Sequence, residues 1–223
     1  LGFGFAHVAI ATGSSWRGDG MGRRLLRPAS LDGADVLTPD DLMAGRRPQH
    51  RNVLVYDDDH YYMGGVLAEL LVKEGFTVSV VTPAAEVSTW MRMTMEQLFV
   101  QHRLVNLGVR IVSHHALVSA DAGHVTIACG FTNRETVFDD CSLVTVTARL
   151  PHNALLADLT ARRAEWADSG LASVTLIGDA LAPGTIAAAV WAGRRYAEEL
   201  DETRGPVDAG MRREVTGLAA GPF

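Results

Sequence analysis

The sequence predicts an α/β protein in which one lobe is inserted into another. Three observations predict this fold. Residues 51–82 follow the order strand, helix, strand, an apolar run near the start of the chain ends at Gly13, and a similar run near its end stops at Gly178 and Asp179. Alternating strands and helices favour a mainly parallel sheet covered by helices.

The composition agrees with one large or two small globular domains. The 223 residues are 48% hydrophobic and 21% charged, with a formal net charge of −6. Because the basic residues are scattered rather than gathered into a stripe, nucleic acid is not an expected partner. No apolar run approaches the roughly 18 to 20 residues that span a bilayer. We therefore expect a cytoplasmic protein without a membrane partner.

The first part of the chain predicts one strand and a long connection. HVAIATG (7–13) is a β-branched run that ends in small residues, which is typical of a buried strand and its turn. Residues 14–50 are rich in Gly, Pro, Arg and Asp and predict an irregular connection. Within it, a helix is expected over residues 39–44, with Thr38 as its cap and Gly45 at its end.

A second unit begins at residue 51. Residues 51–56 predict a buried strand, residues 63–75 a helix that stops at a glycine, and residues 76–82 a second strand. A further helix is expected over residues 94–107, and residues 109–149 contain several short β runs separated by turn signals. This order predicts a βαβ lobe followed by a small meander.

The last part of the chain, like the first, predicts a strand that ends at a glycine-containing turn. Residues 154–170 and 184–202 predict helices on either side of a strand at 173–180. The expected organisation has three parts: residues 1–45 as the first part of a nucleotide-binding-like domain with its connector, 46–150 as the inserted lobe, and 151–223 as the second part with the C-terminal tail.

The strand that ends in Gly178 and Asp179 is a candidate nucleotide site. Its carboxyl end and the following helix place a carboxylate and free backbone N–H groups at one edge of the sheet, where dinucleotides bind. Asp179 would accept a hydrogen bond from a ribose or ribitol hydroxyl, and the amides around Thr185 would face a pyrophosphate. A plain turn with a helix-capping aspartate explains this motif equally well.

The inserted lobe carries a poor NAD motif. A dinucleotide site would read GxGxxG with glycines near positions 57, 59 and 62, but the chain reads DDDHYY. Tyr62 is expected to crowd the helix against the strand, and Thr82 stands where an acid should bind the ribose. Two unit charges about 4 Å apart repel by roughly 4 kcal/mol at an effective dielectric constant of 20, so these carboxylates oppose a pyrophosphate. NAD is not predicted here.

Metal and catalytic sites are not predicted either. The run DDDH could supply hard-metal ligands, but consecutive residues rarely converge on one ion. Cys129 and Cys141 have no metal or redox spacing and predict two buried thiols without a disulfide. The sequence contains no GxSxG and no Cys–His pair at a suggestive spacing, so no catalytic residue is assigned.

Five segments together carry a family resemblance over essentially the whole chain. They are HVAIATGSSWR, DVLTPDDLMAG, NVLVYDDDHYYMGGVLAELLVKEGFTVSVVT, SLVTVTARLP and VTLIGDALAP. The chain resembles the C-terminal nucleotide-binding region of trimethylamine dehydrogenase and its relatives, the dimethylamine and histamine dehydrogenases of the NADH:flavin oxidoreductase and Old Yellow Enzyme type. This resemblance implies a partial Rossmann-like FAD/NAD(P)-binding fold with an inserted βαβ nucleotide-binding-like domain.

The resemblance also implies cofactors, partners and site residues. ADP or FAD would have a structural role in a cleft lined by Ala11, Thr12, Gly13, Gly178, Asp179 and Thr185. Amine oxidation would take place on an N-terminal barrel that carries FMN and a 4Fe–4S cluster and lies outside this chain. The expected partners are therefore a nucleotide, this barrel and a second copy of the chain.

Two alternatives stay open at this point. The chain could be a scaffold or dimerisation module that binds no nucleotide, or an NADH-dependent reductase resembling dienoyl-CoA reductase. If the strands at 6–11 and 173–178 lie side by side, the first also has an open edge. We expect that edge to be paired with another copy or covered by residues 1–5.

Overall fold

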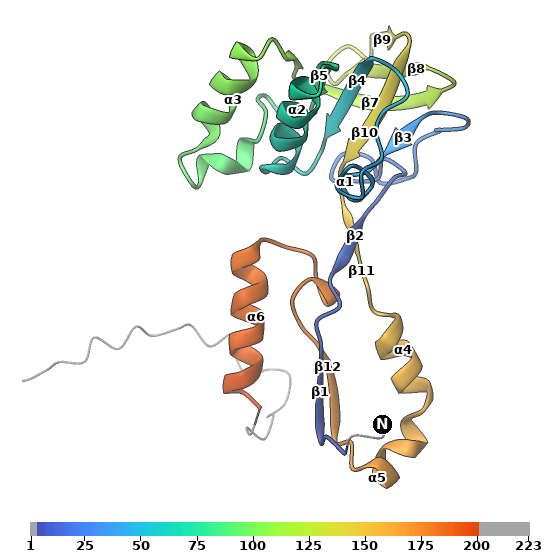
Figure 1. Ribbon diagram of the computed structural model, residues 1–223, viewed down its shortest axis with the longest axis vertical. Coiled ribbons are helices and arrows are strands. Elements are labelled where there is room, and N and C mark those ends of the chain that lie inside the picture. Colours follow the sequence, from blue (N-terminus) through green and yellow to red (C-terminus); the bar gives the residue numbers. More distant parts are fainter. Residues whose placement is uncertain (1–3, 201–223) are drawn as a thin grey trace, which may run out of the picture.

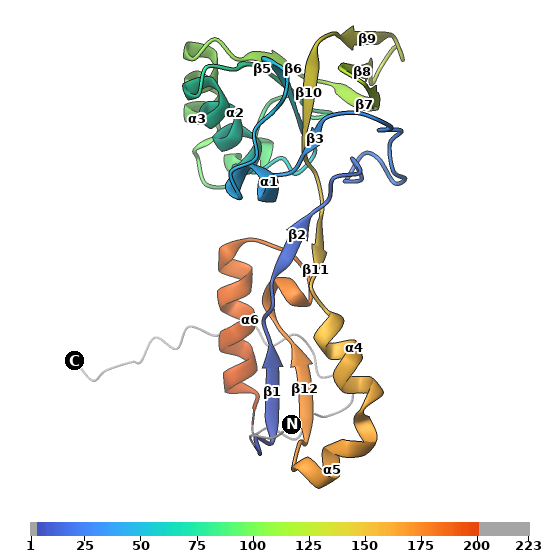
Figure 2. The same ribbon diagram turned by 45° about the vertical axis from the view of Figure 1, so that its right-hand side comes forward.

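A computed structural model describes residues 4–200 and shows two lobes joined by a narrow ribbon (Figures 1 and 2). We call residues 36–146 the inserted lobe. The strands and helices built from residues 7–10 and 154–198 form the terminal lobe. The chain leaves the terminal lobe once and returns to it once, and the inserted lobe begins at Val36, ten residues before the expected boundary at residue 46, because Val36 and Leu37 pair with its sheet.

The inserted lobe is built on a parallel sheet with the strand order β3-β10-β4-β5-β6. Helices α2 and α3 cover one face of it, and the antiparallel strands β7-β8-β9 lie on the other (Figure 1). The elements are β3 (Val36–Leu37), α1 (Pro39–Met43), β4 (Asn52–Asp57), α2 (Met63–Lys73), β5 (Thr77–Val81), η1 (Thr89–Arg92), α3 (Gln97–Asn106), β6 (Arg110–Val112), β7 (His115–Asp121), β8 (His124–Cys129), β9 (Glu135–Phe138) and β10 (Cys141–Val146).

Strand β4 shows how the sequence fills both layers of this lobe. Val53 and Val55 point into the core under the helices, together with Leu71. Leu54 and Tyr56 point to the opposite core, against the meander. Because alternate residues of a strand face opposite sides, the continuous apolar run VLVY is what a strand buried on both faces requires.

The two lobes are joined by a two-stranded ribbon whose pairing the sequence did not reveal. Strand β2 (Ser14–Trp16) pairs antiparallel with β11 (Arg149–Pro151), and Trp16 lies opposite Arg149. Residues 14–16 were expected to belong to an irregular connection, and that expectation was wrong. A three-residue strand is too short to show the alternation of apolar and polar residues that identifies a strand in a sequence. Its partner strand also lies far along the chain.

The terminal lobe brings the two ends of the described chain together. Strand β1 (His7–Ile10) pairs parallel with β12 (Ser173–Leu176), and Ile10 lies opposite Leu176. The predicted adjacency of these strands is confirmed. The other elements of the lobe are α4 (Ala154–Ala161), η2 (Arg163–Glu165), α5 (Trp166–Ser169), η3 (Gly178–Ala180) and α6 (Ile186–Glu198).

Helix boundaries follow local hydrogen bonding. Helix α1 has the expected cap, because the Thr38 side chain accepts from the Asp41 amide and the Asp41 carboxylate accepts from the Thr38 amide. The helix expected over 94–107 begins only at Gln97, since Met95 has a φ of 60° that no right-handed helix accommodates.

The helix expected over residues 154–170 is interrupted. The carbonyl of Leu159 accepts from the Trp166 indole N–H at 2.9 Å and from the Arg162 amide at 3.2 Å, and the second bond closes a tighter turn than that of an α-helix. The chain therefore passes through the short η2 segment before α5 begins.

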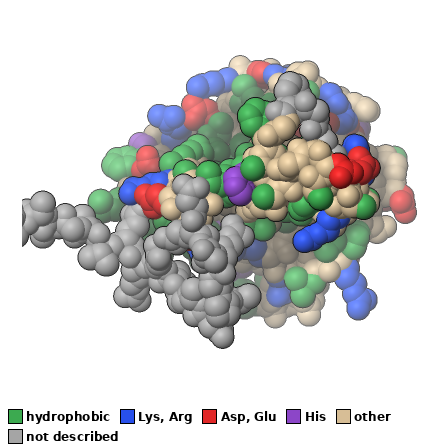
Figure 3. Space-filling model, turned by 90° about the horizontal axis from the view of Figure 1, so that it is seen from below, with side chains coloured by type: hydrophobic (Ala, Val, Ile, Leu, Met, Phe, Trp, Pro, Cys, Tyr) green, Lys and Arg blue, Asp and Glu red, His purple; other side chains and the backbone are tan. Residues whose placement is uncertain are grey.

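The terminal lobe has little core of its own. Among its described apolar residues only Ile10, Leu171 and Ala180 are fully buried, and helices α4 and α6 contain no buried residue. Figure 3, seen from the end of this lobe, shows hydrophobic side chains at the surface between charged ones. A two-stranded sheet is marginal by itself.

The edge of β1 opposite β12 was expected to be paired with another copy or covered by residues 1–5. Within residues 4–200, β1 pairs only with β12. Residues 1–3, which were expected to help cover the edge, lie outside the described residues. No helix within residues 4–200 is long and apolar enough to cross a membrane.

Candidate functional site

The six residues predicted to line a nucleotide cleft lie on the terminal lobe. Ala11, Thr12 and Gly13 follow β1, and Gly178 and Asp179 follow β12, so both turns leave the same edge of the paired strands. Gly13 and Gly178 have φ values of 77° and 56°, a region that favours glycine. A Cβ at Gly13 would meet no atom within 4 Å, so the space beside this turn is open.

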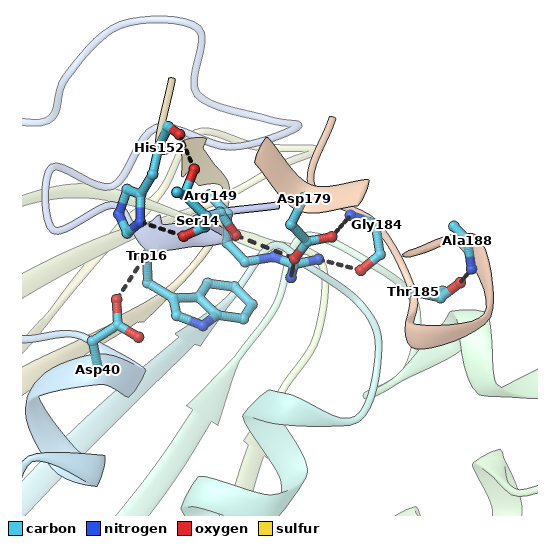
Figure 4. Close-up of polar contacts among 10 residues, drawn as sticks. Ser14, Trp16, Asp40, Arg149, His152, Asp179, Gly184, Thr185 and Ala188 are labelled. Carbon is cyan, nitrogen blue, oxygen red and sulfur yellow. Dashed lines mark hydrogen bonds and ion pairs between the residues drawn. The ribbon is translucent and has the colours of Figure 1, made fainter. Parts of the chain in front are cut away.

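Asp179 is the centre of a hydrogen-bond network (Figure 4). Its Oδ2 accepts from Arg149 Nη1 at 2.7 Å and from Ser14 Oγ at 3.2 Å, and its Oδ1 accepts from the Gly184 amide at 3.0 Å. Arg149 Nη2 also donates to the Gly184 carbonyl at 2.6 Å. A carboxylate has about four acceptor positions, so one is left for a ligand hydroxyl.

Thr12 and Thr185 use their side chains within the protein. The Thr12 hydroxyl donates to the carbonyl of His152, whose amide donates to the Gly13 carbonyl at 2.9 Å. The Thr185 hydroxyl accepts from the Ala188 amide at 3.2 Å and caps α6. The first N–H groups of α6 beyond this cap point toward the helix N-terminus, where anions bind well.

The Arg149–Asp179 pair predicts a measurable loss of stability. We expect Arg149→Gln to cost about 1–3 kcal/mol, because it leaves Asp179 short of a charged donor in a half-buried site. Arg162→Gln is the control, since the Arg162 and Glu165 side chains are 55% and 53% exposed. Urea denaturation should separate the two variants, with faster amide exchange over 178–186 in the first. Equal effects would contradict this role of Arg149.

A cavity of about 600 Å³ lies beside Asp179, between the two lobes. Two arginine–tryptophan stacks face it: the Arg149 guanidinium lies 5.2 Å from the ring centre of Trp16, and that of Arg23 lies 5.2 Å from the ring centre of Trp90. The lining residues are Trp16, Arg23, Asp59, Tyr61, Tyr62, Met63, Trp90, Met93, Thr94, Arg149, Asp179, Pro183, Gly184, Thr185, Ile186, Ala189 and Val190.

Sequence reasoning placed only Asp179 and Thr185 in this region. Trp16 and Arg23 come from residues interpreted as an irregular connection, and Arg149 ends the region of short β runs. The strand pairing that brings Trp16 and Arg149 together was not predicted. The only sequence signal was the unusual density of aromatic residues after β4, where Tyr61 and Tyr62 stand.

A carboxylate of the loop after β4 accepts hydrogen bonds from the loop's own backbone amides. Asp57 Oδ1 accepts from the amides of Asp59 and His60 at 3.2 and 2.9 Å, which are groups that a phosphate would otherwise use. Asp57 is fully buried, and this burial raises the pKa of its carboxyl to about 7. Asp58 accepts from the Arg24 amide at 2.7 Å and is also fully buried.

One steric expectation for this loop was wrong. Tyr62 is 39% exposed and does not separate α2 from β4. The close approach is made by Gly64, where an added Cβ would lie 2.7 Å from Asp57 Cγ. Helix α2 begins at Met63, as expected, and the glycine that meets the strand is Gly64, two residues after the position where the motif would place one.

The described residues offer no fit for an iron–sulfur cluster or another metal. No group of three or more His, Cys, Asp or Glu side chains within residues 4–200 is arranged to hold a metal ion. Cys141 is buried, which raises the pKa of its thiol to about 11, whereas Cys129 is only half-buried. The expectation of two buried thiols thus holds for Cys141 alone.

Comparisons with known proteins agree with this arrangement. A family model described as the OYE-like second alpha/beta domain matches residues 37–137. Dimethylamine dehydrogenase from Hyphomicrobium sp. (strain x) is 28% identical over 225 residues, covering 91% of this chain and 30% of that protein.

Two solved structures share the fold at higher identity. Histamine dehydrogenase from Rhizobium sp. 4-9 has a TM-score of 0.89 and 45% identity, covering 97% of this chain and 34% of that chain. The 6-hydroxypseudooxynicotine amine oxidase from Pseudomonas geniculata N1 has a TM-score of 0.80 and 38% identity, covering 87% and 29%.

The chain spans about a third of the length of these relatives. The match with histamine dehydrogenase extends over both lobes and the ribbon, not only over the inserted lobe. The chain is therefore homologous to the corresponding third of dimethylamine and histamine dehydrogenase, and its residues 37–137 match the OYE-like second α/β domain.

Proposed function

We propose that the chain is the nucleotide-binding segment of a longer amine dehydrogenase that contains FMN and a 4Fe–4S cluster. In this role it holds ADP or FAD structurally, and substrate oxidation takes place on a barrel elsewhere in the longer protein. The observation that carries the proposal is the shared carboxyl edge of β1 and β12, where the turns at Gly13 and Gly178 leave two neighbouring strands. The homology to amine dehydrogenases supports it.

The residues at this edge suit a nucleotide in several respects. The open space at Gly13 allows a ligand to approach the backbone closely. The N-terminus of α6 supplies N–H groups and the positive end of the helix dipole, both of which favour phosphate. Asp179 retains one acceptor position for a hydroxyl. ADP supplies no redox chemistry, which fits a structural role.

Calorimetry with ADP tests the proposal. We expect saturable heat with the 223-residue chain, and Gly13→Val should weaken ADP binding at least tenfold because its side chain fills the open space. Gly45→Val is the matched control: Gly45 also has a positive φ and no atom within 4 Å of an added Cβ, but it lies at the end of α1. Absence of heat at millimolar ADP would contradict nucleotide binding.

The scaffold hypothesis has one observation in its favour. Asp179 already receives three hydrogen bonds from Arg149, Ser14 and Gly184, so the network is stable without a ligand. Under this hypothesis ADP gives no heat and the terminal lobe serves only to pack against the rest of the longer protein.

The NADH-dependent reductase is the weaker alternative. In the inserted lobe, Asp57 Oδ1 accepts from the loop amides that a pyrophosphate would need. We expect no change in NADH fluorescence when this chain is added. A saturable change would overturn this assignment of the inserted lobe.

A further inference from the structure

We propose that the exposed face of helix α3 is the contact surface of a dimer, in which a second copy of this chain packs its own α3 antiparallel to the first. Helix α3 lies at the outer side of the inserted lobe, and α2 separates it from the parallel sheet (Figures 1 and 2). This surface includes no residue of the nucleotide crevice or of the cavity between the lobes, so the inference does not depend on the proposed function.

Large apolar side chains gather at the start of α3. Met95, Leu98 and Phe99 are 83%, 77% and 74% exposed, and we call these three residues the α3 patch. Apolar side chains that are exposed singly are common on protein surfaces, whereas neighbouring ones mark surfaces that contact another molecule. Methionine and phenylalanine are also enriched in protein–protein interfaces. The α3 patch therefore has the composition of an interface.

Met95 holds its side chain in the α3 patch at a conformational cost. Its φ of 60° lies in the left-handed region, which glycine and asparagine adopt more readily than methionine. Because the Met95 side chain is largely exposed, packing within the described residues does little to offset that cost. A second copy that covered the α3 patch would bury this side chain and supply the packing.

The charges beside the α3 patch make the surface complementary to itself. Glu96, Phe99 and Arg103 are spaced i, i+3 and i+7, which places them on one side of a helix. Within residues 4–200 Glu96 forms no ion pair, and its Oε2 accepts from the Thr94 hydroxyl at 2.9 Å. The Arg103 side chain is 67% exposed, although its Nη1 lies 3.1 Å from Glu69 Oε2. A free negative charge thus precedes the apolar centre, and an accessible positive charge follows it.

A second copy in the antiparallel orientation satisfies this pattern. Positions 96 and 103 lie about 10 Å apart along a helix axis, and their midpoint lies beside Phe99. A two-fold axis at this point would bring the two Phe99 rings together and would set each Glu96 opposite the Arg103 of the other copy. Such an interface uses the same surface on both copies. A parallel copy would place like charges opposite each other, so the antiparallel arrangement is favoured.

Sedimentation velocity of the 223-residue chain tests the proposal. We expect a reversible equilibrium between monomer and dimer when the concentration is varied about a hundredfold. Phe99→Glu should weaken the dimer about tenfold or more, because a two-fold interface buries the new charge twice. Phe131→Glu is the matched control, since Phe131 is 77% exposed but lies in the loop between β8 and β9. Circular dichroism checks that both variants fold.

A charge exchange tests the antiparallel register. Glu96→Lys and Arg103→Glu should each weaken association, because each variant places like charges opposite each other at both ends of the interface. An equal mixture of the two variants should associate more tightly than either variant alone, since the mixed dimer restores opposite charges at both ends. Loss of the pair between Arg103 and Glu69 does not affect this comparison, because the Arg103→Glu chain lacks it both alone and in the mixture.

Three results would overturn the proposal. The chain could stay monomeric at every concentration, in which case another part of the longer protein would be the candidate for covering the α3 patch. Phe99→Glu and Phe131→Glu could affect association equally, which would place the interface elsewhere on the chain. Finally, the mixture of Glu96→Lys and Arg103→Glu could associate no more tightly than either variant alone, which would contradict the antiparallel pairing.

Discussion

Gly64→Ala should destabilise the inserted lobe by about 3 kcal/mol. The new Cβ would lie 2.7 Å from both Cγ and Oδ2 of Asp57, whose side chain is fully buried and held by two loop amides. Neither α2 nor β4 can yield without disturbing the core around Leu67 and Val55. Urea denaturation followed by circular dichroism measures the loss.

Gly193→Ala provides the matched control. Gly193 also lies within a helix, α6, but an added Cβ there meets no atom within 4 Å. Alanine has the higher helix propensity, so this variant should gain about 0.5–1 kcal/mol. If the two variants shifted stability in the same direction, the close approach of α2 to β4 at Gly64 would be wrong.

The stability of the inserted lobe should fall as the pH rises from about 4 to about 7. Burial raises the pKa of Asp57 to about 7, whereas an aspartate in the unfolded chain titrates near 3.9. Between these values the folded state holds a proton that the unfolded state has released. The stabilisation of the folded state that comes from this pKa difference is therefore fully present below about pH 4. It is lost as the pH rises through about 7, and the free energy of unfolding falls by an amount on the order of 2–4 kcal/mol.

Asp57→Asn should flatten this dependence. The asparagine carbonyl can still accept from the Asp59 and His60 amides, but the side chain carries no charge to bury. Urea denaturation at a series of pH values measures the slope. Asp168→Asn, at an exposed position on α5, should run parallel to the wild type. An unchanged slope in Asp57→Asn would show that another group, such as Asp59, carries the effect.

Much of the fold could be predicted because its signals are local. The continuous apolar run of β4, the capped helix α1 and the glycine that ends α2 each need only a few neighbouring residues. The ribbon between β2 and β11 could not be predicted in this way. Its strands are three residues long, and their pairing depends on partners far apart in the sequence.

The adjacency of the two strand ends was predicted, but the contacts around them were not. The two strand ends at Gly13 and Gly178 meet as expected, because parallel strands expose their carboxyl ends at one edge. The ion pair between Arg149 and Asp179 could not be inferred, because Arg149 lies on β11 and the pairing of β11 with β2 was not predicted. Likewise, the inward turn of Asp57 follows from loop geometry that no motif specifies.

Amide hydrogen exchange with and without ADP tests most directly whether the two strand ends form one nucleotide crevice. Saturating ADP should slow exchange at residues 11–14 and 178–186 together, since these segments lie at the same edge of the β1–β12 pair. Two results would contradict a nucleotide crevice at this edge. Amide exchange could slow only in the loop at residues 57–65, or it could stay unchanged at 11–14 and 178–186 although ADP gives measurable binding heat.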